Sequence, residues 1–191
     1  MRNYLSGLAF CLAAFSAQAD DYVIDGKGTH TFVQFKASHL GYSWLYGRFN
    51  DFSGEFSYDP KDDSANKISM TVDVTSIDTN HSERDKHLRG DKFLDVEKNG
   101  KATFVSKSYT STGEGKATLV GDLTLMGITK EIKFDVDVVG GGNDPWGGYR
   151  QGFEARATLS TEDFGMKSHG NFPKVDLIIS VEGCKKPTKA C

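Results

Sequence analysis

The sequence has little that could build a metal site from thiols or attract a nucleic-acid backbone. Only three cysteines occur among 191 residues, and two of them stand in the short C-terminal tail. The 23 basic residues are scattered among 26 acidic ones, which leaves a formal net charge of −3. A chain without a basic patch does not attract polyanions, so nucleic acid is not expected as a partner.

Motifs of the common catalytic classes are also missing from the sequence. There is no Gly-x-Ser-x-Gly turn for an activated serine and no Gly-rich loop for phosphate. The body of the chain also has no cysteine that could act as a nucleophile. We therefore expect no enzymatic activity, no catalytic residues and no catalytic cofactor.

Long apolar runs are absent beyond the first residues, MRNYLSGLAFCLAAFSAQA (1–19). This segment has Arg2 near its start, then an apolar run, and ends on the small-x-small pattern Ala17-Gln18-Ala19. These features predict a secretory signal that is cleaved after Ala19, and the run is too short to span a bilayer. Cys11 directly follows Phe10. A lipoprotein signal needs a small residue at the position before its cysteine, so we do not expect a lipoprotein. We expect an exported chain with no transmembrane anchor.

The C-terminal tail, residues 184–191, carries the cysteines that remain after cleavage. Cys184 and Cys191 close a short loop, and an exported chain meets an oxidising compartment, so a disulfide between them is expected. Two free thiols are the alternative. A metal site is disfavoured because no third ligand stands nearby.

An alternation of apolar and polar residues dominates residues 20–183, which we expect to form one domain. The pattern is clearest in KISMTVDVTSID, EIKFDVDVV and KVDLIISVEG, and it recurs in about eight segments. Such alternation predicts antiparallel strands with one buried and one solvated face. Met126-Gly127 predicts a hairpin turn between two strands, and GGGNDPWGGYR predicts a long loop.

The number and length of these segments favour a closed barrel. An antiparallel sheet of about eight long strands tends to close on itself, because closure removes the exposed edges. A two-sheet sandwich is the alternative, but strands of about ten residues favour the barrel. An outer-membrane barrel is disfavoured, because the phenylalanines stand in mid-strand rather than in girdles at the strand ends. The interior would be filled by side chains or would hold one small ligand.

One stretch, NHSERDKHLRGDKFLD (80–95), departs from the alternation. Asn80 and Glu83 have the spacing of a capping box, and Gly90 can end a helix. We expect a short helix from His81 to about Arg89 across one end of the barrel.

Three interpretations of this helix remain open. It can be a solvated helix with structural ion pairs, or a lid whose Arg84 or His87 meets the polar end of a ligand. A metal site is disfavoured, because His81 and His87 do not share a face of one helix.

Two aromatic segments also have two interpretations. His39, Trp44 and Tyr46 in SHLGYSWLYGRF can plug one end of the barrel or form the rim of a pocket. Trp146 and Arg150 in DPWGGYRQGF can likewise plug an end of the barrel or form the rim of a pocket.

Six ordered segments together resemble the YceI-like family. They are HLGYSWLYGRF, DTNHSERDKHLR, FLD, GDLTLMGITK, DPWGGYRQGFEA and VDLIISVEG, and the resemblance covers about residues 21–183. It implies a periplasmic, lipocalin-like barrel, here of eight antiparallel strands with a short helix at one end. It also implies a bound isoprenoid-type lipid, either a polyprenyl compound or an isoprenoid quinone, and no established enzymatic activity. The tail lies outside the resemblance, and KSHGNFPK fits it less clearly.

A barrel that encloses such a lipid would touch it with its inward-facing side chains and with residues at its mouth. Burial of about ten hydrocarbon carbons contributes on the order of 8 kcal/mol before ordering costs. The candidate contact residues are Phe35, Ala37, His39, Trp44, Phe52, Phe56, Met70, Val72, Arg84, Leu88, Phe104, Phe134 and Phe153.

The leading hypothesis is a periplasmic lipid carrier that makes transient contact with a membrane, although no amphipathic anchor is evident. A second hypothesis is an enzyme that acts on the lipid head group, with His81, Asp85 or His87 as acid or base. A third is a structural or stress protein whose barrel is filled by its own side chains.

Overall fold

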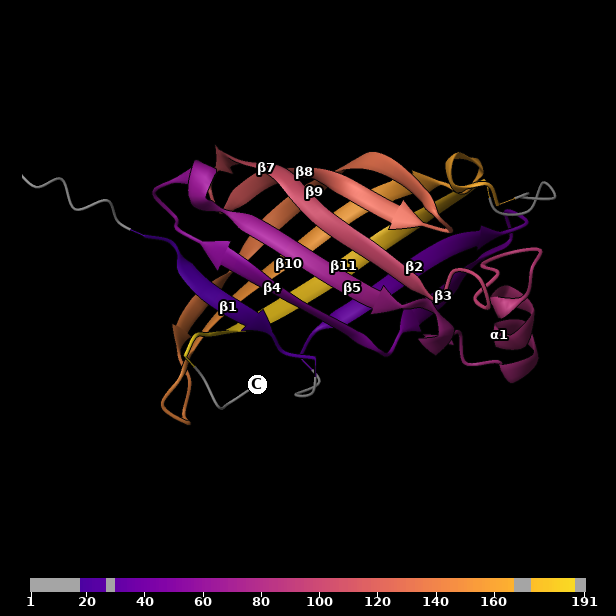
Figure 1. Ribbon diagram of the computed structural model, residues 1–191, viewed down its shortest axis with the longest axis horizontal. Helices are drawn as coiled ribbons and strands as arrows, with labels where there is room; N and C mark the ends of the chain where they lie inside the picture. The colour runs from indigo at the N-terminus through magenta and orange to yellow at the C-terminus, as the bar shows by residue number, and fades with distance from the viewer. Residues whose placement is uncertain (1–17, 27–29, 167–172, 188–191) are drawn as a thin grey trace, which may run out of the picture.

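A closed ring of strands forms the framework of the computed structural model, which describes residues 18–26, 30–166 and 173–187 (Figure 1). Each strand of the ring pairs antiparallel with its neighbours, and the last pairs with the first. In spatial order the ring consists of β1 (Asp20–Ile24), β4 (Phe52–Tyr58), β5 (Lys67–Asp73), β7 (Lys101–Gly113), β8 (Lys116–Leu125), β9 (Ile128–Asn143), β10 (Tyr149–Ser160) and β11 (Lys174–Lys185). The predicted all-β, eight-stranded antiparallel barrel with a short helix is confirmed.

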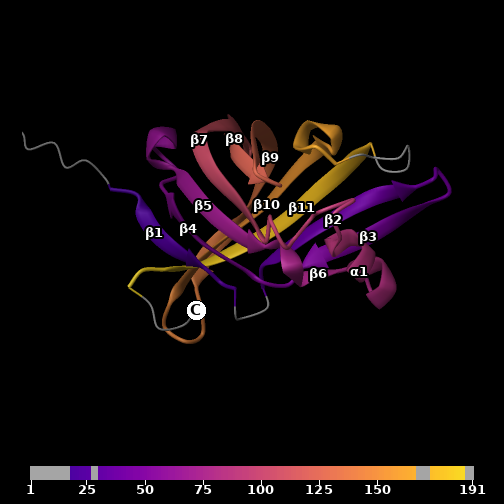
Figure 2. The same ribbon diagram turned by 45° about the vertical axis from the view of Figure 1, so that its right-hand side comes forward.

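A hairpin branches from the ring at β11. Residues 183–185 of β11 pair with β1, whereas residues 175–180 pair with β2 (Phe32–His39). β2 continues through a turn into β3 (Ser43–Phe49), whose end pairs with the short β6 (Ile77–Asp78). β1 and the β2–β3 hairpin therefore lie toward opposite ends of the barrel (Figure 2).

The alternation in the sequence becomes an inside and an outside. Phe134 and Val136 of β9 are 4% and 5% exposed. The polar residues that alternate with these two face outward. One of them, Asp137, forms ion pairs with Lys116 and Arg156 of the neighbouring strands. The sheet therefore presents its apolar face to the interior of the barrel.

Of two predicted connections, the structure contains one as expected and shortens the other. β8 and β9 are joined by Met126 and Gly127 in left-handed conformations, as the predicted tight hairpin turn requires. The predicted long loop is shorter than expected, because β9 continues through Gly140–Asn143, which pair with the start of β10. Backbone pairing across a bulge thus keeps these glycines in the sheet.

Aromatic residues fill the barrel at the end where β1 closes it, which we call the closed end. Phe56 stacks on Tyr22 at a centroid distance of 4.7 Å and meets the edge of Phe153 at 5.5 Å. Phe56 also covers Gly183 so closely that a Cβ there would lie 2.3 Å from the ring. A glycine in β11 is therefore required for this ring to pack.

The opposite end carries the helix α1 (Ser82–Arg89), which begins and ends close to its predicted bounds. The predicted cap at Asn80 is wrong: the N-cap is His81, whose Nδ1 accepts a hydrogen bond from the Arg84 amide. Asn80 has a left-handed backbone (φ 61°), which turns the chain before the helix starts. Gly90 follows the last helical residue, as predicted.

Two side chains attach α1 to the segment that precedes it. Arg89 donates from Nε to the carbonyl of Thr75 and from Nη2 to that of Ile77, both at 2.7 Å. Asp85, only 7% exposed, accepts hydrogen bonds from the amide and the hydroxyl of Thr79. These bonds hold a helix of eight residues that would be too short to be stable alone.

Three single turns of 3₁₀ helix complete the described elements. They are η1 (Asp63–Ala65), η2 (Val74–Ser76) and η3 (Glu162–Phe164). None of the helices in the described ranges is long and apolar enough to cross a membrane.

Both chain ends extend beyond what the structure describes. Of the predicted signal peptide, residues 1–17 lie outside the described residues. Cys184 is buried at the end of β11 and is disulfide-bonded. Its predicted partner, Cys191, lies outside the described residues, so this pairing stays a prediction.

Removal of the Arg89 side chain should loosen α1 without opening the barrel. We expect Arg89→Ala to lower the local stability of the helix by about 1–2 kcal/mol, because two charge-assisted hydrogen bonds to backbone carbonyls are lost. Hydrogen exchange of the α1 amides should then be roughly tenfold faster, with the strand amides unchanged. Lys86→Ala, at an exposed position of the same helix, is the control. Unchanged exchange in Arg89→Ala would contradict the anchoring role.

The closed end should make the protein sensitive to alkaline pH. Burial, followed by the charge of Asp20, raises the pKa of Tyr22 from 10.0 to about 12. The neutral phenol is therefore favoured by folding, and its contribution to stability is complete below pH 10 and is lost as the pH rises through about 12.

Replacing this phenol should weaken that dependence. In Tyr22→Phe, the free energy of unfolding should fall less steeply above about pH 10 than in the unmodified protein. Denaturant titrations across this pH range measure the effect, and Tyr42→Phe, at a position that is 85% exposed, is the control. Identical pH profiles for Tyr22→Phe and the unmodified protein would contradict the assignment.

Candidate functional site

The interior between the closed end and α1 encloses a cavity of about 350 Å³. Its wall is formed by inward-facing residues of the ring and of the β2–β3 hairpin, and α1 lies across its outer end. Cavities that hold small ligands measure roughly 300–1,000 Å³. The barrel therefore contains a space of ligand size rather than a core that its own side chains fill completely.

Almost all of the lining is apolar. Among the described residues, the polar members of the lining are Arg84, His87, Thr103 and Thr161, and aliphatic and aromatic side chains supply the rest. A cavity lined in this way stays dry, because a water molecule needs several polar partners. Its chemistry suits a hydrocarbon and disfavours a charged or highly hydroxylated molecule.

The depth of the cavity is limited by the aromatic packing of the closed end. Val33, Met70 and Val181 line the cavity and also belong to the core cluster that contains Tyr22 and Phe56. Phe153 joins this cluster and meets the edge of the Tyr58 ring at 5.0 Å. A ligand would therefore meet packed rings at the inner end and could not pass through the barrel.

Polar groups are concentrated at the outer end of the cavity, which we call the mouth. Arg84 of α1 donates from Nε to the Thr79 hydroxyl at 2.7 Å and from Nη2 to the Thr79 carbonyl at 2.6 Å. Within the described part of the chain, its Nη1 and both ring nitrogens of His87 have no hydrogen-bond partner. The His87 ring meets the edge of Phe93 at 5.4 Å. The mouth thus offers free donors at the edge of an apolar cavity.

Eight of the thirteen candidate contact residues line this cavity. They come from the barrel wall and from α1, and they are Phe35, Ala37, Met70, Val72, Arg84, Leu88, Phe104 and Phe134.

The other five candidates lie elsewhere. Phe52, Phe56 and Phe153 belong to the packed cluster of the closed end. Trp44 is 55% exposed on the outer face of β3, where the ammonium of Lys36 lies 4.6 Å from its ring centroid. His39 ends β2 and is exposed. Neither belongs to the cavity rim.

Leu45 and Phe49, which are not among the candidate contact residues, line the cavity from β3. They stand in SWLYGRF, where apolar or aromatic residues occupy both faces of the strand. Because Trp44 and Tyr46 are also large and apolar, the sequence did not show which residues of this strand face inward. The small residue Gly47 could have revealed it, because the Phe35 ring covers that position from inside the barrel.

The three candidate acid–base residues of α1 do not converge on one point of the cavity. Asp85 is buried against Thr79, and His81 caps the helix with its ring nitrogen. Of the three, only His87 lines the cavity. These three residues therefore do not form a pair of groups poised for proton transfer.

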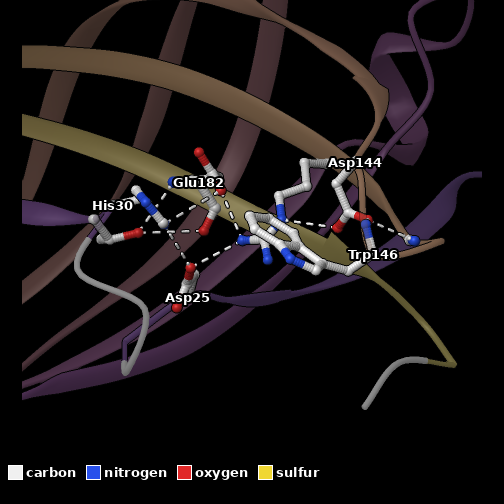
Figure 3. Close-up of polar contacts among 8 residues, drawn as sticks. Asp25, His30, Asp144, Trp146 and Glu182 are labelled. Carbon is white, nitrogen blue, oxygen red and sulfur yellow. Dashed lines mark hydrogen bonds and ion pairs between the residues drawn. The ribbon is translucent and has the colours of Figure 1, made fainter. Parts of the chain in front are cut away.

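A separate group of charged residues lies at the closed end (Figure 3). Nη1 of Arg150 donates to Asp25 at 2.9 Å and to Glu182 at 2.7 Å, and its Nε donates to Asp144 at 3.1 Å. The Gly148 amide and Arg150 lower the pKa of Asp144. The pocket-rim interpretation of Trp146 and Arg150 therefore does not fit, because neither residue lines the cavity.

This group contains three potential metal ligands. Asp25, His30 and Glu182 offer ligand atoms within 4.8 Å of one another. However, the Arg150 guanidinium already contacts both carboxylates, and its positive charge opposes a cation there. The group is better explained as an ion network that joins β1, β10 and β11.

Solved structures share this architecture. The YCEI protein of Campylobacter jejuni is 25% identical with a TM-score of 0.70, covering 97% of this chain and 99% of its own. BcnA of Burkholderia cenocepacia is 21% identical with a TM-score of 0.73, covering 80% of this chain and 95% of its own. A domain of Saccharophagus degradans described as polyisoprenoid binding is 15% identical with a TM-score of 0.64, covering 88% of this chain and 99% of its own. The last two similarities show a shared fold only.

Sequence relatives are much more similar. A UPF0312 protein of Serratia proteamaculans is 51% identical over 183 residues, which are 95% of either chain. Another, from Ectopseudomonas mendocina, is 50% identical over 190 residues, which cover 97% of this chain and 100% of that protein. Residues 22–183 match the model of the family described as the YceI-like domain. This match spans most of the sequence, and the chain therefore belongs to the YceI-like domain family.

Proposed function

We propose that this protein binds one isoprenoid-type lipid, a polyprenyl compound or an isoprenoid quinone, in the barrel and carries it within the periplasm. The observation that carries the proposal is the cavity of about 350 Å³, which is closed by packed rings at its inner end and whose described lining has its polar residues at the mouth. Such a cavity suits a molecule with an apolar chain and one polar end.

The apolar chain would supply most of the binding free energy. Each methylene group that leaves water contributes roughly 0.8 kcal/mol, and no polar group in the inner wall has to be desolvated. The preformed wall also reduces the ordering cost, because the ring of strands holds the lining in place. The shape of the cavity would then determine which lipid chains are bound.

The polar end of the lipid would stay at the mouth. Nη1 of Arg84 and one ring nitrogen of His87 can donate to carbonyl or phosphate oxygens there. Arg84 is held in place by its two hydrogen bonds to Thr79, so its free donor has a defined position. The described residues of the inner wall are apolar and offer no such donors, which would orient the lipid with its chain inward.

The polyisoprenoid-binding domain of Saccharophagus degradans supports the class of ligand, since it shares this fold. The signal-like N-terminus supports export. The two rival hypotheses have less support. A lipid-modifying enzyme would need reactive groups that converge at the mouth, where His87 is the only acid–base candidate of α1. A barrel filled by its own side chains does not fit the cavity.

Native mass spectrometry of protein purified from its own periplasm, followed by organic extraction, tests the proposal. We expect one lipid of isoprenoid type per protein and a mature N-terminus at Asp20. Protein of apo mass that takes up neither added ubiquinone nor added polyprenol would overturn the proposal.

A larger side chain in the cavity should block binding without unfolding the barrel. Ala155 of β10 lines the cavity beside Val136 and Ile179, so Ala155→Phe would place a ring where the lipid chain would lie. We expect lipid uptake to fall about tenfold or more, because the displaced chain loses its burial.

The matched control lies on the outer face of the same strand. Thr158 is exposed and donates to Asp176 at 2.7 Å, so Thr158→Phe adds a ring of the same size outside the cavity. Uptake is measured by quenching of protein fluorescence by a quinone, and folding by circular dichroism. Equal uptake by both folded variants would contradict the cavity as the binding site.

A further inference from the structure

Exposed aromatic and apolar side chains gather on the outside of the β2–β3 hairpin. Leu40, Tyr42, Trp44 and Tyr46 are 53%, 85%, 55% and 61% exposed, and we call these four residues the hairpin patch. Single exposed apolar residues are normal on a protein surface. Four of them along one hairpin form a patch of the kind that marks an interaction surface.

The hairpin patch lies beside the mouth of the cavity. Phe35 and Ala37 of β2 and Leu45 of β3 line the cavity with the inner face of the hairpin. Trp44 and Tyr46 stand on the opposite face of the same β3 strand. Val175 of β11 pairs with Ala37 of β2 and with Leu159 near the end of β10, so the hairpin turn lies at the end of the barrel where β10 finishes. α1 covers this same end (Figure 2).

The chemistry of the patch matches the interface between a bilayer and water. Tryptophan and tyrosine combine a large apolar ring with a polar edge, and they are enriched where membrane proteins cross the head-group region. The turn projects beyond the barrel (Figure 2), and Leu40 and Gly41 in it have left-handed backbones (φ 54° and 79°). A protruding turn of this shape can insert between lipid head groups.

Two basic side chains of the hairpin are paired with acidic residues. Lys36 lies 3.6 Å from Asp176, and Arg48 lies 3.2 Å from Asp78. In the described part of the chain, these pairs neutralise the lysine of β2 and the arginine of β3. Attraction would come from the burial of apolar area, which salt does not screen.

We propose that the hairpin patch docks the protein onto the surface of a phospholipid bilayer, with the mouth of the cavity beside the membrane. This inference rests on the proposed function, since a lipid cargo has to leave the bilayer without crossing water. Docking at this position would let the chain pass from the membrane into the cavity along the inner face of the same hairpin.

A second copy of the chain is the competing occupant. In the described part of the chain, β3 pairs on its outer side with β6 only at Arg48 and Phe49. The remaining edge of β3 could accept a strand from another protein. The protruding turn argues against this occupant, because Leu40 and Tyr42 lie in the turn, outside the strand edge that such pairing would cover.

The two tryptophans of the sequence provide a matched pair of reporters. Trp44 belongs to the hairpin patch, whereas Trp146 is 72% exposed at the closed end, near Arg150. In Trp146→Phe the emission reports on Trp44 alone, and in Trp44→Phe it reports on Trp146 alone. Vesicles of phosphatidylethanolamine and phosphatidylglycerol should shift the Trp44 emission to the blue, at low and at high salt, and leave that of Trp146 unchanged.

The functional consequence is tested with the double variant Tyr42→Ser/Trp44→Ser. We expect its affinity for the vesicles and its rate of polyprenol pickup from them to fall about tenfold, because two large rings no longer leave water. Uptake of polyprenol added from ethanol should be unchanged, because neither residue lines the cavity. Trp146→Ser is the control and should behave like the unmodified protein.

Three outcomes would overturn docking through the patch. One is a Trp44 emission that vesicles do not change, and another is equal loss of binding in Trp146→Ser. The third is a Trp44 shift that follows protein concentration without vesicles and accompanies a dimer mass, which would assign the patch to a second copy. Failure of the proposed function looks different: the unmodified protein would bind vesicles but take up no polyprenol from ethanol.

Discussion

The backbone pairing of β11 is the constraint on which the rest of the structure depends. One edge of this strand is shared between β2 and β1, so the barrel is completed by different strands at its two ends. β1 brings Tyr22 against Phe56 and closes one end with packed rings. The β2–β3 hairpin forms the wall at the other end, where α1 lies across the opening. A cavity closed at one end follows from this division.

The two ends of the barrel carry different kinds of polar chemistry. At the closed end, Arg150 joins three carboxylates in a network that ties β10 to β11 and to the chain after β1. At the mouth, Arg84 is only partly satisfied by Thr79 and keeps a donor available. Buried charges that are paired serve the fold, whereas a free donor beside an apolar cavity is suited to a ligand.

Alternation in the sequence was sufficient to predict the strands, the barrel and most of the wall, because a period of two assigns each side chain to the inside or the outside. Eight of the candidate contact residues line the cavity for this reason. Prediction failed where alternation was ambiguous, as in SWLYGRF, where Leu45 faces inward and Trp44 outward. Phe56 and Phe153 also face inward, as the alternation predicts, but they pack against Tyr22 and Tyr58 instead of lining the cavity.

The sequence by itself determined the class of fold and the position of the helix, since both depend on local periodicity and on turn residues such as Gly90 and Gly127. Only the tertiary structure decided which part of the interior is filled and which is empty. That distinction depends on how side chains from distant strands meet, as Phe56 meets Gly183 across the closed end. The same holds for Arg150 and Trp146, whose place at the closed end is set by the register of β10 against β9 and β11.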